Sequence, residues 1–266
     1  TVGGGLGQVI MPLLASFLLT GFNWRTRSRW RWSARRWGRS GRGRFFTRRP
    51  EEMGLLPYGQ RQEAREMDRA PESGFPFREA IRTRAFWSIF AAAFLSVFGQ
   101  VMVLMHLVNY ATDPEIGISR GMAATFLSVI GGANIAGKLV VGPISDHIGR
   151  KVALASCFAV GGLMMLWLIE ARSPWMFYTF AAIYGFVFGG WIPMFPAMMG
   201  DLFGMGSLGA LIGAIYAGNG LGGSAGPFLA GLIFDITGSY FLAFRIVAVL
   251  FFTAAGLILS VKRPER

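Results

Sequence analysis

Long stretches without charged residues alternate with short polar connections along this chain. A membrane-spanning helix needs about 20 predominantly apolar residues, and each stretch comes close to that length or exceeds it. Only Lys138 and Arg245 interrupt them. The stretches are Thr1–Trp24, Phe86–Thr112, Gly121–Ser145, Val152–Ile169, Ser173–Gly200, Leu202–Phe234 and Ile236–Val261. We therefore expect seven membrane-spanning helices.

Glycine within these stretches does not argue against helices, because lipid offers the backbone no other hydrogen-bonding partner. Small residues four apart allow two helices to approach closely. Such spacings occur at Gly185/Gly189, Gly209/Gly213 and Gly218/Gly222/Gly226. The pattern predicts a packed bundle of α-helices, whereas an outer-membrane barrel would show short alternating segments.

The composition agrees with a membrane protein. Hydrophobic residues make up 53% of the 266 residues and charged residues only 15%, whereas a soluble domain carries about 25% charged residues. This balance excludes a soluble enzyme, a soluble binding module and a disordered chain. A single cysteine, Cys157, rules out an internal disulfide framework, and two histidines are too few for a zinc site built from this chain alone. We expect no metal and no cofactor.

The net charge of +12 comes from one segment. Eleven arginines and no acidic residue lie between Arg25 and Arg49, which leaves fifteen basic and fourteen acidic residues elsewhere. The expected connections between spans include Asp113–Arg120, Asp146–Lys151, Glu170–Pro174 and Asp201–Ser207. Because basic loops face the cytoplasm, we place residues 25–84, the Arg150/Lys151 connection and the C-terminal tail inside. The connections Asp113–Arg120 and Glu170–Pro174 are then external.

An internal repeat predicts a further membrane span at the segment Asn23–Phe46, where the sequence is strongly basic instead. Residues 3–15 align without gaps with residues 218–230, and seven of thirteen positions match. Internal repeats are a feature of secondary transporters, and the second copy is followed by one more span. The first copy is followed instead by a segment with nine Arg and four Trp. We favour a frame-shifted reading of a damaged helix there. A solvated loop, a surface for anionic lipid and, least favoured, a nucleic-acid contact are the alternatives.

Two motifs resemble a known family. The sequence GPISDHIGRK at 142–151 resembles the signature loop of the major facilitator superfamily, and RRPEEMGLLPYG at 48–59 resembles the start of the central loop in its monocarboxylate and oxalate:formate branch. HLVNYATD at 106–113 also looks like that branch. The family has twelve helices in two halves. The resemblance implies that residues 1–24 are the fifth helix, residues 25–84 the central loop with a damaged sixth helix at 23–46, and residues 85–266 a C-terminal six-helix bundle.

The signature loop implies a gate. Asp146 and Arg150 are four residues apart, within reach of a mutual ion pair. In the family this cluster latches the cytoplasmic gate. The residues that the resemblance assigns to it are Gly142, Asp146, Gly149, Arg150, Lys151 and Asp201. We expect Gly142 and Gly149 to permit tight backbone contact.

Polar side chains inside the spans are candidates for a substrate or ion pathway, because burying them in a membrane is costly. Helical spacing places several of them on shared faces. The candidates are His106, Asn109, Tyr110, Asn134, Lys138, Tyr184, Tyr216 and Asn219. A cationic Lys138 with amide and phenol donors would suit a small carboxylate, and His106 is a candidate for carrying a coupled proton, because histidine as a residue type changes its charge near physiological pH. Snorkelling of Lys138 to the interface and a purely structural His106 are the alternatives.

Together these features predict a fragment of a secondary transporter in a bacterial-type inner (plasma) membrane. We expect the intact transporter to move a small organic anion, a monocarboxylate, by alternating access with proton symport or anion exchange. The partners are membrane lipid, the anion, a proton or counter-anion, and a missing N-terminal half without which this chain does not transport. No catalytic residue set is visible. The alternative is a non-transporting seven-span protein that uses its Arg/Trp-rich segment to tether anionic lipid or nucleic acid.

Overall fold

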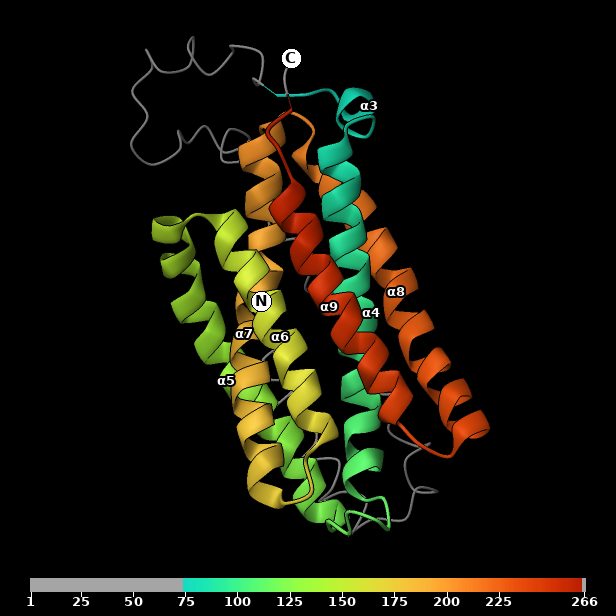
Figure 1. Ribbon diagram of the computed structural model, residues 1–266. Helices are drawn as coiled ribbons and strands as arrows, with labels where there is room; N and C mark the ends of the chain where they lie inside the picture. The colour runs from blue at the N-terminus through green and yellow to red at the C-terminus, as the bar shows by residue number, and fades with distance from the viewer. Residues whose placement is uncertain (1–73, 265–266) are drawn as a thin grey trace, which may run out of the picture. The chain divides into compact units, whose positions relative to one another are not determined.

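The computed structural model describes residues 74–264, and these are helical (Figure 1). A short helix, α3, is followed by six long ones, and the only pairing of extended residues within this part is an isolated bridge between Gly74 and Gly204. The elements are α3 (Phe77–Ala80), α4 (Arg84–Ala111), α5 (Arg120–Ile148), α6 (Arg150–Ile169), α7 (Pro174–Phe203), α8 (Leu208–Thr237) and α9 (Phe241–Ser260). The expected all-helical membrane fold is therefore confirmed for this part of the chain.

The predictions for the first seventy residues lie outside the described residues. They are the span Thr1–Trp24, the damaged helix at 23–46 and most of the loop 25–84. They stay predictions.

The long helices begin and end close to the predicted limits, with two differences. We expected connections at Asp146–Lys151 and Asp201–Ser207. Instead α5 runs on to Ile148 and only Gly149 separates it from α6, while α7 continues to Phe203. Gly149 has a φ of 88°, a left-handed value that glycine adopts without strain. The connection between α5 and α6 is therefore a single sharply turned residue.

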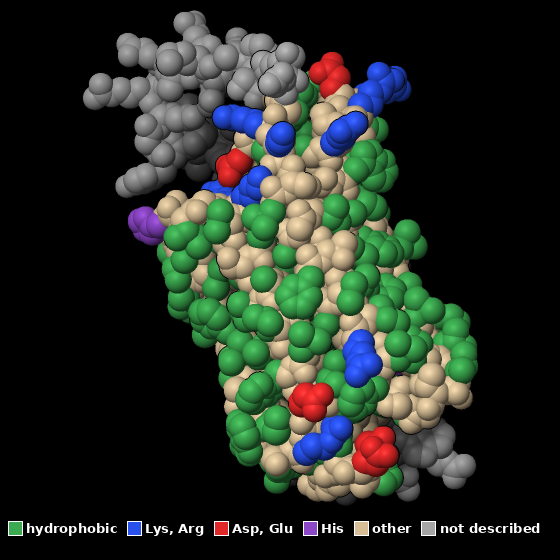
Figure 2. Space-filling model, viewed as in Figure 1, with side chains coloured by type: hydrophobic (Ala, Val, Ile, Leu, Met, Phe, Trp, Pro, Cys, Tyr) green, Lys and Arg blue, Asp and Glu red, His purple; other side chains and the backbone are tan. Residues whose placement is uncertain are grey.

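The polypeptide runs up and down, so that consecutive helices are antiparallel (Figure 1). One end of the bundle gathers the start of α4, the α5–α6 turn, the end of α7 and the end of α9. We call it the basic end, because Arg84, Arg150, Lys151, Lys262 and Arg263 lie there. Figure 2 shows Lys and Arg at this end and a broad hydrophobic band below them. The opposite end, which carries Asp113, Glu115, Glu170 and Asp235, is called the acidic end.

Five helices, α4, α5, α6, α7 and α9, are long and apolar enough to cross a membrane. The sequence predicted a sixth span where α8 lies. α8 is 30 residues long and has no charged residue before Asp235, but its many glycines lower its hydropathy. It packs along α4 within the same bundle. The six-helix bundle is thus present.

Glycines set the closest helix contacts. The pairs are α5 with α7, α4 with α8, and α6 with α9. A Cβ added at Gly189 would overlap the backbone of Asn134 on α5, and one added at Gly226 would overlap the Phe98 carbonyl on α4. These contacts confirm two of the predicted small-residue spacings. The prediction for Gly209/Gly213 is wrong within the described residues, because an added Cβ there meets nothing within 4 Å.

Candidate functional site

Arg150 is the centre of a charged cluster at the basic end. It is the first residue of α6, and its Nη1 donates to Asp201 Oδ2 at 2.8 Å and to the Ala197 carbonyl at 3.0 Å. Its Nη2 donates to Asp146 Oδ1 at 3.3 Å. One guanidinium thus joins the start of α6 to the ends of α5 and α7. Its planar fork of donors suits such a three-way contact better than the single ammonium of a lysine would.

The other predicted gate residues have different surroundings. Lys151 turns away from Arg150 and donates to the Val261 carbonyl at the end of α9, at 2.7 Å. We expected tight backbone contact at Gly142 and Gly149. Among the described residues an added Cβ at either position meets nothing within 4 Å, so tight contact at these glycines stays a prediction. Gly149 is required by its backbone angle instead.

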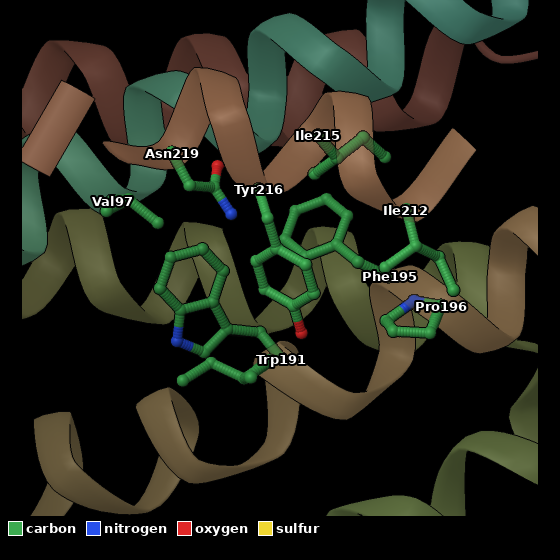
Figure 3. Close-up of a pocket in the computed structure, with 9 residues that line it drawn as sticks. Val97, Trp191, Phe195, Pro196, Ile212, Ile215, Tyr216 and Asn219 are labelled. Carbon is green, nitrogen blue, oxygen red and sulfur yellow. The ribbon is translucent and has the colours of Figure 1, made fainter. Parts of the chain in front are cut away.

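A cavity of about 30 Å³ lies where α4, α7 and α8 meet (Figure 3). Val97 borders it from α4, and Tyr216 and Asn219 reach it from α8. The aromatic wall comes from α7. The full lining is Val97, Trp191, Ile192, Phe195, Pro196, Ile212, Ile215, Tyr216 and Asn219. We call it the central cavity.

The central cavity combines apolar walls with few polar atoms. Asn219 Oδ1 is buried and accepts no hydrogen bond within the described part of the chain. Tyr216 is 54% exposed, and in Figure 3 its phenol points toward Trp191. Among residues 74–264 no acidic side chain lines the cavity. Amide and phenol donors in an apolar surrounding are suited to orienting a small polar or anionic group.

A second group of predicted residues lies near the acidic end, and some of their side chains form hydrogen bonds between helices. His106 Nε2 lies 3.1 Å from the Pro227 carbonyl of α8, and Nδ1 lies 3.2 Å from Tyr240 Oη. Because a carbonyl only accepts, Nε2 carries the hydrogen. Burial raises the pKa of the Tyr240 phenol above its ordinary value. Tyr240 therefore keeps its proton at neutral pH and donates it to Nδ1 when the imidazole is neutral.

Tyr110 and Asn109 are neighbours in the sequence but differ in burial and in the contacts of their side chains. The Tyr110 hydroxyl contacts the Leu168 and Ile169 carbonyls at 3.2 and 3.1 Å, and Arg172 Nη1 donates to it at 3.2 Å. Tyr110 thereby caps the end of α6. Asn109 is exposed and lies beside the Tyr240 phenol.

The remaining predicted residues lie on α5 and α7. Asn134 is 1% exposed, and its amide finds no hydrogen-bonding partner among the described residues. Lys138 lies one turn further along α5 and is half-buried. Tyr184 is enclosed by aromatic side chains of α7 and α9. Its hydroxyl also lacks a partner in the described part. None of the three lines the central cavity, so the eight predicted pathway residues do not form one site.

The sequence profile of the Major Facilitator Superfamily matches residues 89–266, about two thirds of the chain. The chain belongs to the Major Facilitator Superfamily. It is an integral membrane protein that crosses the bilayer several times. The bundle α4–α9 corresponds to the C-terminal half of the superfamily fold.

Several members of the superfamily are similar to this chain. An uncharacterized MFS-type transporter of Escherichia coli (strain K12), YhjX, is 28% identical over 173 residues, which are 63% of this chain and 42% of that protein. Monocarboxylate transporter 12 of Mus musculus is 27% identical over 176 residues, or 64% of this chain and 36% of the relative. The matched part thus spans less than half of either relative.

Sequence reasoning missed two side chains that shape these sites. Phe195 forms the aromatic wall of the central cavity together with Trp191, and Tyr240 holds His106. The wall residues lie four apart on α7, a helical spacing that was available in the sequence. Tyr240 lies in the α8–α9 connection, and nothing in the sequence links it to His106.

Proposed function

We propose that this chain forms the C-terminal half of a secondary active transporter for small organic anions, with monocarboxylates as the substrate class. Substrate would cross by alternating access between this bundle and a second, N-terminal bundle. Proton symport or anion exchange would drive the movement. The observation that carries the proposal is the central cavity, where Tyr216 and Asn219 face an apolar wall.

The chemistry of the central cavity suits a carboxylate with a short apolar tail. The Asn219 amide and the Tyr216 hydroxyl supply donors, and a hydrogen bond to a charged acceptor is about twice as strong as one between neutral groups. Trp191 and Phe195 provide surface for the tail. The similarity to transporters named for monocarboxylates supports the same substrate class. The cavity holds about 30 Å³, so a substrate also requires space contributed by an opening movement or by the second bundle.

Lys138 and His106 are proposed as the charge-compensating and proton-carrying groups. Lys138 would bring a positive charge to the inner part of α5, next to Asn134. When His106 gains a proton at Nδ1, the Nε2 hydrogen bond to Pro227 is kept and Tyr240 Oη changes from donor to acceptor. Both contacts survive the change, so the imidazole is able to load and release a proton without repacking.

The Arg150 cluster is proposed as part of the cytoplasmic latch. Its acceptors, Asp146 and Asp201, are more than half exposed. They therefore offer free carboxylate surface to a second bundle. The cytoplasmic position of the basic end follows from its excess of Lys and Arg.

Carboxylate binding tests the proposal. The purified full chain, reconstituted in lipid nanodiscs, is titrated with lactate while tryptophan fluorescence is recorded. We expect saturable quenching, and Asn219→Leu should weaken binding tenfold or more, about the value of one hydrogen bond to a charged group. Tyr178→Phe, which removes a phenol that contacts Thr125 at the acidic end, is the matched control and should bind normally. Unchanged affinity in Asn219→Leu contradicts the proposed site.

Uptake into proteoliposomes tests the need for a second bundle. The full chain alone should give no saturable lactate flux, because half of the alternating structure is contributed by other residues. Saturable flux would show that the chain suffices.

A further inference from the structure

We propose that a basic hollow between α4 and α9 binds the phosphate headgroup of an anionic phospholipid. This inference does not rest on the proposed transport activity. The hollow lies at the basic end, where α4 begins and α9 ends, and has a volume of about 480 Å³. Its polar lining is Thr83, Arg84, Ser88, Ser260, Lys262 and Arg263. We call it the basic pocket.

The charged side chains that the structure describes around the basic pocket are all positive. Arg84 lines it at the start of α4 and Lys262 and Arg263 just after the end of α9, and among residues 74–264 neither Asp nor Glu lines it. The hydroxyls of Thr83 and Ser260 also border it but already donate to the Ala80 and Leu257 carbonyls, each at 2.7 Å. The cations are therefore the donors that match the charged oxygen atoms of a phosphate diester. The contents of the lining thus select a phosphate-bearing anion.

Neighbouring groups add to the positive potential. The first amide groups of α4 carry the positive end of the helix dipole. The carbonyl end of α9 would oppose it, but Lys151 donates to the Val261 carbonyl at 2.7 Å. This contact places a fourth cation beside the basic pocket and satisfies one of the exposed carbonyl groups. The positive potential that favours an anion therefore extends over the start of α4 and the end of α9.

The basic pocket lies at the level of the membrane surface, which favours a lipid headgroup over a soluble phosphate as its ligand. Trp87 lies on α4 one turn beyond Arg84, is 56% exposed, and donates its indole N–H to the Ile81 carbonyl at 2.8 Å. Exposed tryptophans at the end of a span lie at the level of the lipid headgroups. At the same level the last turn of α9 exposes Leu259, which is 54% exposed and adjoins the lining residue Ser260. A headgroup in the basic pocket would thus lie next to apolar surface that its acyl chains can contact. Basic pockets between helices on the cytoplasmic side are a known way to hold anionic lipid.

Lipid binding by the full chain in neutral detergent tests the inference. Native mass spectrometry measures the affinity for short-chain phosphatidylglycerol, with phosphatidylcholine as the neutral lipid and glycerol 3-phosphate as the soluble anion. Each of Arg84→Gln, Lys262→Gln and Arg263→Gln should weaken phosphatidylglycerol binding about fivefold, and the triple variant about a hundredfold, from the usual contribution of one basic residue at an anionic surface. The matched control is Arg120→Gln, which removes an exposed cation at the acidic end.

The outcomes separate the possible sources of phosphate. Selective loss of phosphatidylglycerol binding in the pocket variants, with phosphatidylcholine binding unchanged, supports the inference. Equal losses in Arg120→Gln would show a general charge effect and overturn it. Equal affinity for glycerol 3-phosphate would assign the basic pocket to a soluble anion and also overturn the lipid assignment. Because all three side chains are exposed, the single variants should fold normally, and circular dichroism checks this.

Discussion

Removing the Arg150 side chain should destabilise the bundle by about 2–5 kcal/mol. Arg150→Ala deletes two ion pairs, at 2.8 Å to Asp201 and 3.3 Å to Asp146. Both partners are more than half exposed, so solvent screening limits each pair to about 0.2–1 kcal/mol. The hydrogen bond to the Ala197 carbonyl is the larger contribution, because a bond with one charged partner contributes about 1.5–3 kcal/mol.

The measurement is the unfolding free energy in mixed micelles, followed by circular dichroism. Arg120→Ala is the matched control, because Arg120 is also the first residue of a helix but is exposed, whereas the Arg150 side chain is 31% exposed. Asp201→Asn should cost more than Asp146→Asn, since its carboxylate lies closer to the guanidinium. A double-mutant cycle between Arg150 and Asp201 should give a coupling of about 0.5–1 kcal/mol.

Two results would refute this reasoning. If Arg150→Ala and Arg120→Ala had equal effects, the cluster would contribute nothing beyond an exposed charge. If Asp146→Asn cost more than Asp201→Asn, the order of distances would not govern the energies.

Three further substitutions test other contacts, with Gly132→Ala as the control for the first. Gly189→Ala should destabilise the bundle by about 1–3 kcal/mol through overpacking against α5. Gly132→Ala, where an added Cβ meets nothing, should leave the stability unchanged or raise it by up to about 1 kcal/mol. Denaturation in mixed micelles measures both. Tyr184→Phe should leave stability unchanged or raise it, because the buried hydroxyl has no partner among the described residues, and a clear loss in the same assay would reveal one. Tyr240→Phe should cost about 0.5–1.5 kcal/mol by removing the donor to His106, and its thermal melt should match that of wild type if this bond does not form.

The helices could be predicted from the sequence because charge is absent over long stretches. A span interior tolerates almost no ionised side chain, so the positions of Asp113, Glu170 and Asp235 alone define three connections. The limits were less certain where helices continue beyond the apolar region. α5 carries Asp146 and His147 within its last turn, and nothing in the alternation of polar and apolar residues distinguishes a polar helical turn from a loop.

The candidate site was harder to predict, because spacing along one helix gives a shared face but not the neighbour of that face. Tyr216 and Asn219 were predicted together and do line one cavity. Tyr110 shares its predicted face with His106, yet its hydroxyl contacts the end of α6. The rotation of α4 against α6 and α8 decides between these outcomes. That rotation depends on packing across the bundle, including contacts with Tyr240.

The glycine contacts explain where cavities lie in the described bundle. Within the pairs α5–α7 and α4–α8, backbones approach so closely that an added Cβ would overlap a carbonyl, which leaves no space for side chains that bind a ligand. Space therefore appears where helices of different pairs meet. The central cavity lies between α7 and α8, and the basic pocket lies between α4 and α9. Because small residues bring the helices of each pair into close contact, the cavities with polar side chains lie at the boundaries between pairs.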